Sequence, residues 1–276
     1  LKTSADANTN FGTVKADNIE TINLETDDTN AATAHSATVT LSANSVKTLN
    51  ISGDAGAVLT NTSTTLTSVN ASGLSKVGLT WATIGALASA ATITGSPKAD
   101  NIGDTNNNAA KGVTIDGGLG EDTIKGGGSA DTLTDTSVEA DGDGNKITGG
   151  GGNDTITTGA GKDTIVASAG NDSITAGDGG DSITLNSGNN VVHAGGGVDT
   201  LIAGSGNDTL NGDAGNDIFT MAGNWTKDDV VDGGAGTDTA TVSVTSSVTA
   251  GTTSGIEAIE ATFDAQTDVL ALANLT

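Results

Sequence analysis

The sequence predicts an all-β protein, a parallel β-roll or β-solenoid in which the chain winds in coils that stack along one axis. Three observations predict it: glycine at 41 of 276 residues, aromatic side chains at only 2%, and a nine-residue motif that repeats in register. A core built from aromatic side chains is therefore excluded. Repeats that cannot bury an apolar face alone can bury one by stacking on their neighbours.

The regular tract runs from residue 149 to 220 without an insertion or a deletion. It divides into GGGGNDTIT, TGAGKDTIV, ASAGNDSIT, AGDGGDSIT, LNSGNNVVH, AGGGVDTLI, AGSGNDTLN and GDAGNDIFT. Position 4 is always glycine, and position 6 is aspartate except at Asn190. The acidic composition also fits a disordered chain, but a disordered chain has no reason to keep this register. The register favours the stacked fold.

Each nonapeptide divides into a turn and a strand. Positions 1–6 are rich in glycine and predict a turn, whereas positions 7–9 are too short for a helix and predict a three-residue strand. Position 8 points inward, between outward threonine and serine side chains. The inward residues are Ile156, Ile165, Ile174, Ile183, Val192, Leu201, Leu210 and Phe219. Two nonapeptides then make one 18-residue coil, and successive coils stack roughly 4.8 Å apart.

Turns two repeats apart become neighbours, which places the acids in two rows. One row contains Asp154, Asp172, Asn190 and Asp208, and the other contains Asp163, Asp181, Asp199 and Asp217. Without a cation these rows are repulsive and the pKa of each carboxyl group is raised. One large apolar side chain in nine residues also gives little burial to offset the conformational entropy lost on folding. A hard cation held by carboxylate and backbone carbonyl oxygens would relieve both problems, and this ligand set suits Ca²⁺.

Further copies flank the tract. GGLGEDTIK (117–125) and GGGSADTLT (126–134) precede it and GGAGTDTAT (233–241) follows it. ADGDGNKIT (140–148), with Asn145 at position 6, and GSPKADNIG (95–103) are worn copies. The stretch 135–148 is an acidic loop that could hold an irregular calcium site, whose ligands the sequence does not place.

The motif resembles the RTX calcium-binding nonapeptide, G-G-x-G-x-D-x-(apolar)-x, from Val113 to about Thr241. The resemblance implies a right-handed parallel β-roll that folds when Ca²⁺ binds, and export by type I secretion from Gram-negative bacteria. It also implies a set of metal ligands at position 6, together with loop carbonyl oxygens. These residues are Asp122, Asp131, Asp154, Asp163, Asp172, Asp181, Asp199, Asp208, Asp217, Asp238 and Asn190. Asn190 and Asn145 lose a charge, Ser129 replaces a turn glycine, and Ala240 replaces a larger apolar residue.

A shorter pattern recurs before the motif. It reads IETINL (19–24), VKTLNI (46–51), LTSVNA (66–71) and LSKVGL (74–79), and it returns as IEAIEA (256–261). Its final alternation predicts strands of a wider, calcium-poor solenoid. Residues 18–73 are similar to the segment that precedes RTX repeats in surface-layer proteins of Gram-negative bacteria. We therefore predict a less regular solenoid over 1–112, the calcium-binding roll over 113–241, and the start of a further β module or a cap over 242–276.

Composition excludes several classes of function. The formal net charge of −24, with lysine as the only strong base, disfavours nucleic acid and anionic membranes as partners. The lack of cysteine removes disulfides and thiolate sites. No HExxH motif is present, and the motif accounts for the aspartates of the turns, so we expect no enzyme. Trp81 and Trp225 are expected to cap or fill the stack, and Lys227, Asp228 and Asp229 to form a solvated turn.

Two functions fit these features. The first is a calcium-binding structural segment of a secreted surface-layer protein, located at the cell surface and assembling with other copies of itself. The second is the C-terminal RTX secretion and folding module of a larger adhesin, toxin or exoenzyme exported by type I secretion. The first residue is not methionine, and we expect the chain to be a segment of a longer protein.

Overall fold

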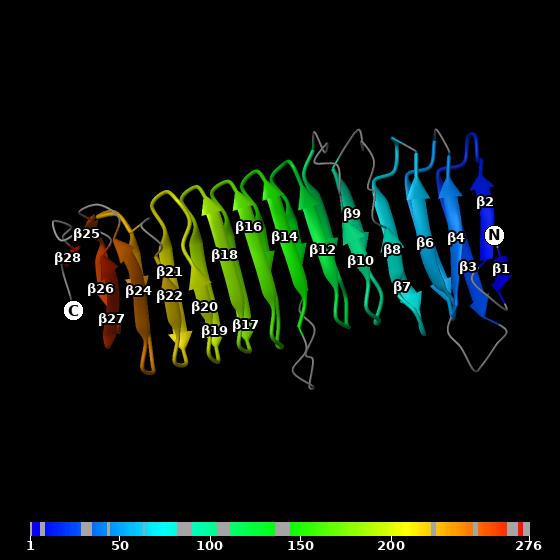
Figure 1. Ribbon diagram of the computed structural model, residues 1–276. Coiled ribbons are helices and arrows are strands. Elements are labelled where there is room, and N and C mark those ends of the chain that lie inside the picture. Colours follow the sequence, from blue (N-terminus) through cyan, green and yellow to red (C-terminus); the bar gives the residue numbers. More distant parts are fainter. Residues whose placement is uncertain are drawn as a thin grey trace.

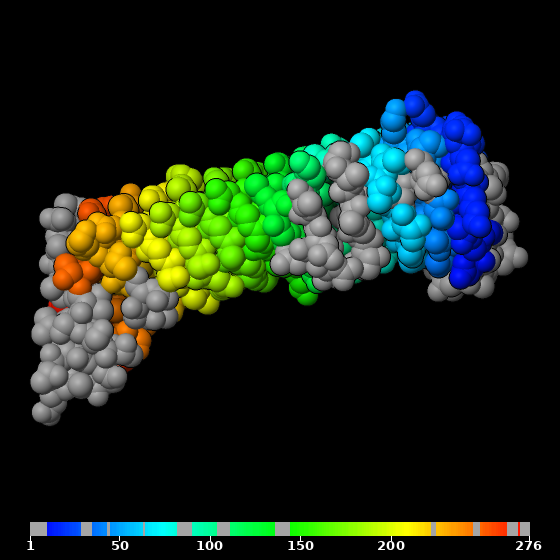
Figure 2. Space-filling model, turned by 90° about the horizontal axis from the view of Figure 1, so that it is seen from above, coloured from blue at the N-terminus to red at the C-terminus, as the bar shows by residue number. Residues whose placement is uncertain are grey.

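The two long faces of the molecule are parallel β-sheets that run along one continuous stack (Figure 1). This computed structural model describes residues 2–5, 9–28, 35–42, 45–62, 64–81, 90–103, 111–135, 144–221, 225–244, 248–263 and 270–272. The described residues form two 13-stranded sheets and one 2-stranded sheet. Figure 2 shows the elongated stack from a second direction.

The first sheet takes every second strand of the chain. It consists of β1 (Lys2–Ala5), β3 (Thr21–Asp28), β5 (Thr48–Gly53), β7 (Ser68–Leu74), β9 (Ala91–Thr94), β11 (Val113–Asp116), β13 (Thr132–Thr134), β15 (Thr155–Thr157), β17 (Ser173–Asp178), β19 (Val191–Gly196), β21 (Thr209–Ala214), β23 (Val230–Asp232) and β26 (Thr252–Ser254).

The second sheet takes the alternate strands. It consists of β2 (Thr9–Val14), β4 (Ser36–Leu41), β6 (Gly56–Asn61), β8 (Leu79–Trp81), β10 (Asn101–Gly103), β12 (Thr123–Gly127), β14 (Lys146–Gly151), β16 (Thr164–Ala169), β18 (Ser182–Ser187), β20 (Thr200–Ile202), β22 (Ile218–Thr220), β24 (Thr239–Val244) and β27 (Ala258–Phe263). The 2-stranded sheet pairs β25 (Val248–Ala250) with β28 (Leu270–Leu272).

The pairing register confirms the 18-residue coil. Ile156 on β15 pairs in parallel with Ile174 on β17, and Ile165 on β16 pairs with Ile183 on β18. The N-terminal pattern stacks in the same way, because Ile22, Leu49 and Val69 occupy one register on β3, β5 and β7. The all-β solenoid predicted from the two patterns is therefore confirmed.

The strands of the nonapeptide tract are longer than we predicted. The expected three residues are found at β15, β20 and β22, but β16, β17, β18, β19 and β21 each contain six. The extra residues are positions 1–3 of the next repeat. Position 1 therefore faces inward as well as position 8, as Ala167 does beside Ile165. The glycine content concealed this, because alanine and glycine at position 1 read as turn residues.

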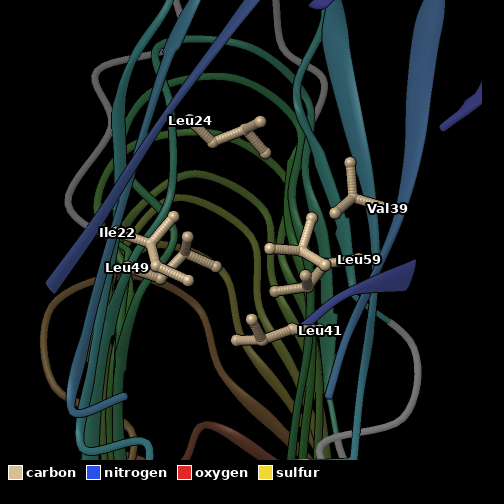
Figure 3. Close-up of a pocket in the computed structure, with 7 residues that line it drawn as sticks. Ile22, Leu24, Val39, Leu41, Leu49 and Leu59 are labelled. Carbon is tan, nitrogen blue, oxygen red and sulfur yellow. The ribbon is translucent and has the colours of Figure 1, made fainter. Parts of the chain in front are cut away.

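The core differs along the stack. In the nonapeptide tract a six-residue strand buries one large side chain and one alanine or glycine, except that β18 buries Leu185 as well as Ile183, whereas the N-terminal strands bury two or three apolar side chains. Figure 3 shows the N-terminal core, where apolar side chains of the two sheets face each other. These side chains are Ile22, Leu24 and Leu49 from the first sheet and Val39, Leu41 and Leu59 from the second. The N-terminal coils therefore bury more apolar surface without help from an ion.

Both sheets continue past residues 112 and 241, and the segment boundaries stay a prediction.

Two position-8 residues that depart in size from the usual Ile, Val or Leu complement each other. Phe219 pairs with Ala240, and both are fully buried, so the small residue accommodates the aromatic ring on the neighbouring strand. Among the described residues there is no helix long and apolar enough to cross a membrane.

Candidate metal sites

The position-6 side chains form two hydrogen-bonded ladders along the edges of the stack. In each ladder the Oδ1 atom accepts a hydrogen bond from the backbone N–H of the position-6 residue one coil earlier. The N–H of Asp154 donates to Asp172 at 2.8 Å and that of Asp163 donates to Asp181 at 2.8 Å. The two-row assignment made from the sequence is therefore confirmed.

The first ladder joins the turns that lead from the second sheet to the first. It contains Asp131, Asp154, Asp172, Asn190 and Asp208. Asp131 accepts from the N–H of Val113 at 2.7 Å, and the N–H of Asp208 donates to Asp229 at 2.8 Å. The ladder thus extends beyond the regular tract at both ends.

The second ladder joins the opposite turns. It contains Asp100, Asp122, Asn145, Asp163, Asp181, Asp199, Asp217 and Asp238. It ends at Glu257, whose carboxylate accepts a hydrogen bond from the N–H of Asp238 at 2.6 Å. All the sequence-predicted ligands therefore lie in one of the two ladders.

The second oxygen of these carboxyl groups is in a different situation. The ladder aspartates of the regular tract are at most 2% exposed. Their Oδ2 atoms are buried with no hydrogen-bond partner among the described residues at Asp154, Asp172, Asp181, Asp199 and Asp217. A buried carboxylate oxygen that accepts nothing is costly unless a cation meets it. Each orphaned Oδ2 is thus a candidate ligand atom.

Position 1 of the same turn forms the other wall of the candidate site. A Cβ atom built on Gly149 would lie 2.5 Å from Oδ2 of Asp154 and 2.7 Å from the carbonyl oxygen of Ala167 in the next coil. The same arrangement recurs at Gly212, with Asp217 Oδ2 at 2.4 Å and the Gly233 oxygen at 2.6 Å. A carboxylate and a carbonyl oxygen therefore converge on the bare side of a glycine.

Burial makes the ladders electrostatically unstable when no cation is present. It raises the pKa of Asp154 and of Asp181 to about 7 and that of Asp217 to about 6, with neighbouring carboxyl groups of the ladder acting in the same direction. It also raises the pKa of Asp163, Asp172, Asp199 and Asp208. Near neutral pH the folded chain therefore retains protons on part of the ladders when no cation neutralises them.

The donor set indicates which cation fits. The converging atoms are oxygens from carboxylates and backbone carbonyl groups, and no cluster of three histidine or acidic side chains occurs in the described part of the chain. Hard oxygen ligands of this kind suit Ca²⁺, which accepts several carbonyl ligands, better than Zn²⁺. The residues present therefore fit calcium held between a turn and its stacked neighbour.

A comparison with protein families gives the same result. The model of the RTX calcium-binding nonapeptide repeat (4 copies) matches residues 114–134, 139–174, 158–192, 193–220 and 226–240. These segments are RTX repeats. The strands before residue 114 lie outside the matched segments of this chain. No curated protein and no solved structure matched it.

Sequence reasoning missed three acids of the RTX ladders, Asp100, Asp229 and Glu257, and did not identify the buried Asp135 beside the second ladder. Asp100 lies at position 6 of the worn copy 95–103 and could have been found from that register. Asp229 and Glu257 depart from the nine-residue spacing, so the motif gave no signal for them. Asp135 lies nine residues after Gly126, at position 1, where the motif has no acid; it is the first residue of the acidic loop 135–148 predicted as an irregular calcium site, of which residues 136–143 lie outside the described residues. Asp100 accepts hydrogen bonds from the N–H groups of Leu79 and Ser96, and burial raises its pKa to about 6.

The predicted solvated turn at 227–229 is wrong in one residue. Lys227 and Asp228 form an exposed ion pair, but Asp229 is only 2% exposed and closes the first ladder. Its Oδ2 accepts a hydrogen bond from the N–H of Thr226 at 2.6 Å, so backbone groups satisfy both oxygens. Trp225 and Trp81 are buried within the stack, in agreement with a filling role.

Proposed function

We propose that this chain is a calcium-binding structural segment of a secreted bacterial surface-layer protein, and that it has no catalytic role. Calcium folds the segment by occupying the sites between stacked turns, where the Oδ2 atom of position 6 and a carbonyl oxygen of the next coil converge beside position 1. We call each of these sites a cradle. Exposed acids along the same edges then share further calcium ions with neighbouring copies. The product of this function is a lattice on the cell surface.

One observation carries the calcium part of the proposal. The ladder carboxylates use one oxygen to fix the coil spacing and leave a second, buried oxygen beside a carbonyl oxygen of the next coil. Without calcium, the carboxylates of each ladder repel one another, and their burial removes the water that would otherwise solvate their charges. With calcium, the same oxygens become ligands, so that the binding free energy becomes folding free energy.

The lattice part rests on other features. Residues 18–73 are similar to the segment that precedes RTX repeats in surface-layer proteins, and the stack is a long rod rather than a closed globule (Figure 2). Asp178, Asp213 and Asp228 are exposed along it, where calcium could bridge two copies. RTX repeat proteins are typically exported by type I secretion, which agrees with folding outside the cell.

Assembly of the full chain tests the proposal. We expect ordered two-dimensional sheets in electron micrographs at millimolar calcium, and dissociation of those sheets when chelator is added. Magnesium at the same concentration is the control. A calcium-bound chain that stays monomeric would contradict the surface-layer function and favour the second reading, a folding module of a larger type I-secreted adhesin, toxin or exoenzyme.

A further inference from the structure

Each ladder aspartate has two tasks that fall on different oxygens. Oδ1 accepts the backbone hydrogen bond that fixes the neighbouring coil, as Asp172 does for Asp154 at 2.8 Å. Oδ2 enters the cradle beside position 1 and supplies the negative charge. An asparagine at position 6 can perform the first task, because its side chain keeps an oxygen, but it cannot supply the charge.

The turn that ends at Asn145 is the one place in the second ladder where position 6 lacks a charge. Asn145 performs the hydrogen-bonding task, because its Oδ1 accepts from the N–H of Asp122 at 2.7 Å. The ladder also continues through it, since its own N–H donates to Asp163 at 2.7 Å. Only the charge is missing from this residue.

Position 1 of that turn carries an acid where the other turns carry glycine, alanine, threonine or another uncharged residue. Asp135 follows β13 directly, its N–H donates to the carbonyl oxygen of Thr157 at 2.8 Å, and its side chain is fully buried. A Cβ atom built on Gly117 would lie 2.7 Å from Oδ2 of Asp135. The same atom would lie 2.2 Å from Oδ2 of Asp122.

Two buried carboxylate oxygens therefore meet in the cradle of Gly117. No described N–H or hydroxyl group donates to Oδ2 of Asp122, which is 1% exposed. The Asp122 side chain instead shares a hydrogen bond with the carboxyl group of Asp135, so the pair holds a proton that a cation would displace. We propose that Asp122 and Asp135 bind one calcium ion together, with the Asp135 side chain supplying a second carboxylate where the regular cradle has a backbone carbonyl oxygen of the next coil. This inference rests on the proposed calcium function and assigns ligands to a site that the nonapeptide register does not contain.

The other asparagine at position 6, Asn190, is not accompanied by an acid at position 1. The turn ending at Asn190 has Leu185 at position 1, and both residues are buried. Nδ2 of Asn190 donates to Oδ1 of Asp208 at 3.0 Å, so an amide hydrogen meets the neighbouring carboxylate. That turn has an apolar side chain and an amide in place of two charges, and we assign no second carboxylate to it.

The test counts calcium ions per chain, by equilibrium dialysis with metal analysis at fixed free calcium. We expect Asp135→Asn to bind one ion fewer than the wild-type chain. The double variant Asp122→Asn/Asp135→Asn should also bind one ion fewer than the wild-type chain, because both carboxylates serve the same ion. Asp17→Asn, an exposed acid outside the ladders, is the matched control and should bind the wild-type number. An unchanged count in Asp135→Asn, or the loss of a second ion in the double variant, would overturn the inference.

A second variant keeps the test decisive if Asp135→Asn fails to fold. Asp122→Asn alone keeps the hydrogen bond from the N–H of Asp100 and removes the other carboxylate of this cradle, so we expect it to lose the same single ion. An unchanged count in this variant would refute the shared site. A wild-type chain that binds no calcium would instead refute the proposed function itself.

Discussion

Glycine at position 4 of the nonapeptide meets two separate requirements. Gly170 has a φ of 141°, which L side chains rarely adopt, and a Cβ atom there would lie 1.6 Å from the carbonyl oxygen of Gly152. The turn of one coil thus rests directly on the backbone of the coil before it. The motif shows that glycine is invariant here, but only the structure shows that close approach and not φ alone excludes a side chain.

Gly170→Ala should therefore destabilise the calcium-bound roll by at least about 2 kcal/mol, through backbone strain and overlap. Gly151→Ala is the matched control, since a Cβ there meets no atom closer than 3.6 Å. The control should change the free energy of unfolding by less than about 0.5 kcal/mol. Denaturant unfolding at saturating calcium measures both, and equal effects would contradict the close-packed turn.

The two oxygens of Asp172 can be separated by substitution. Asp172→Asn keeps the hydrogen bond to Asp154 and removes a buried charge, so it should weaken calcium binding but leave the calcium-free chain no less stable. Asp172→Ala loses both oxygens and should destabilise the chain in both conditions. Thr157→Ala, on the outward face, is the control. Unfolding curves with calcium and with chelator distinguish the cases, and identical behaviour of the two Asp172 variants would refute the division of tasks.

For single residues, the sequence predicts the regular ladder positions well and the irregular ones poorly. Asp154 and Asp181 follow from register, because an 18-residue coil dictates which turns stack. Asp229 does not, since the insertion before it breaks the spacing that identifies the others, and its burial depends on where the longer turn returns to the stack. Asp135 keeps the register, nine residues after Gly126, but position 1 is not a ligand position of the motif, so its role could not be predicted.

The elements of the two halves of the stack draw their stability from different sources. β4 buries Ala37, Val39 and Leu41, whereas β15 buries Ile156 alone. The alternation of apolar residues predicts the first kind of strand directly. The extension of the nonapeptide strands to six residues could not be predicted, because the extra inward position is alanine or glycine in every such strand except β18, which has Leu185, and contributes little to an apolar pattern.

Hydrogen exchange should reveal this difference when calcium is removed. In chelator we expect the amides of β3 to β7 to stay protected, because their apolar core is intact. The amides of β15 to β21 should exchange within the dead time, since the unneutralised ladders no longer hold those coils. Calcium should restore protection to the second group. Equal protection in both groups in chelator would contradict the assignment of stability to ion binding.

For the whole molecule, the raised carboxyl pKa values predict an inverse effect of pH on the calcium-free chain. Burial raises the pKa of Asp154 and Asp181 in the folded chain to about 7, against an ordinary value of 3.8, so the folded state binds more protons. The stability of the calcium-free roll is therefore greatest below about pH 4 and is lost as pH rises through 7. Protons and calcium compete for the same oxygens.

In chelator we therefore expect β-structure to increase when the pH is lowered from 8 to 5, as measured by far-ultraviolet circular dichroism. In limiting calcium, the same acidification should release bound ions. Added salt at pH 8 is the control, because it screens long-range repulsion without protonating the ladders. A calcium-free chain that is equally folded at both pH values would show that the carboxylates do not control the fold.

The central claim is that cations between stacked turns hold the RTX coils together. The most direct measurement is circular dichroism of the full chain at neutral pH as free calcium is raised from zero. We predict a cooperative gain of β-structure with a midpoint at about 10⁻⁴–10⁻³ M, reversed by chelator. A spectrum that is the same in chelator and in saturating calcium would contradict the claim.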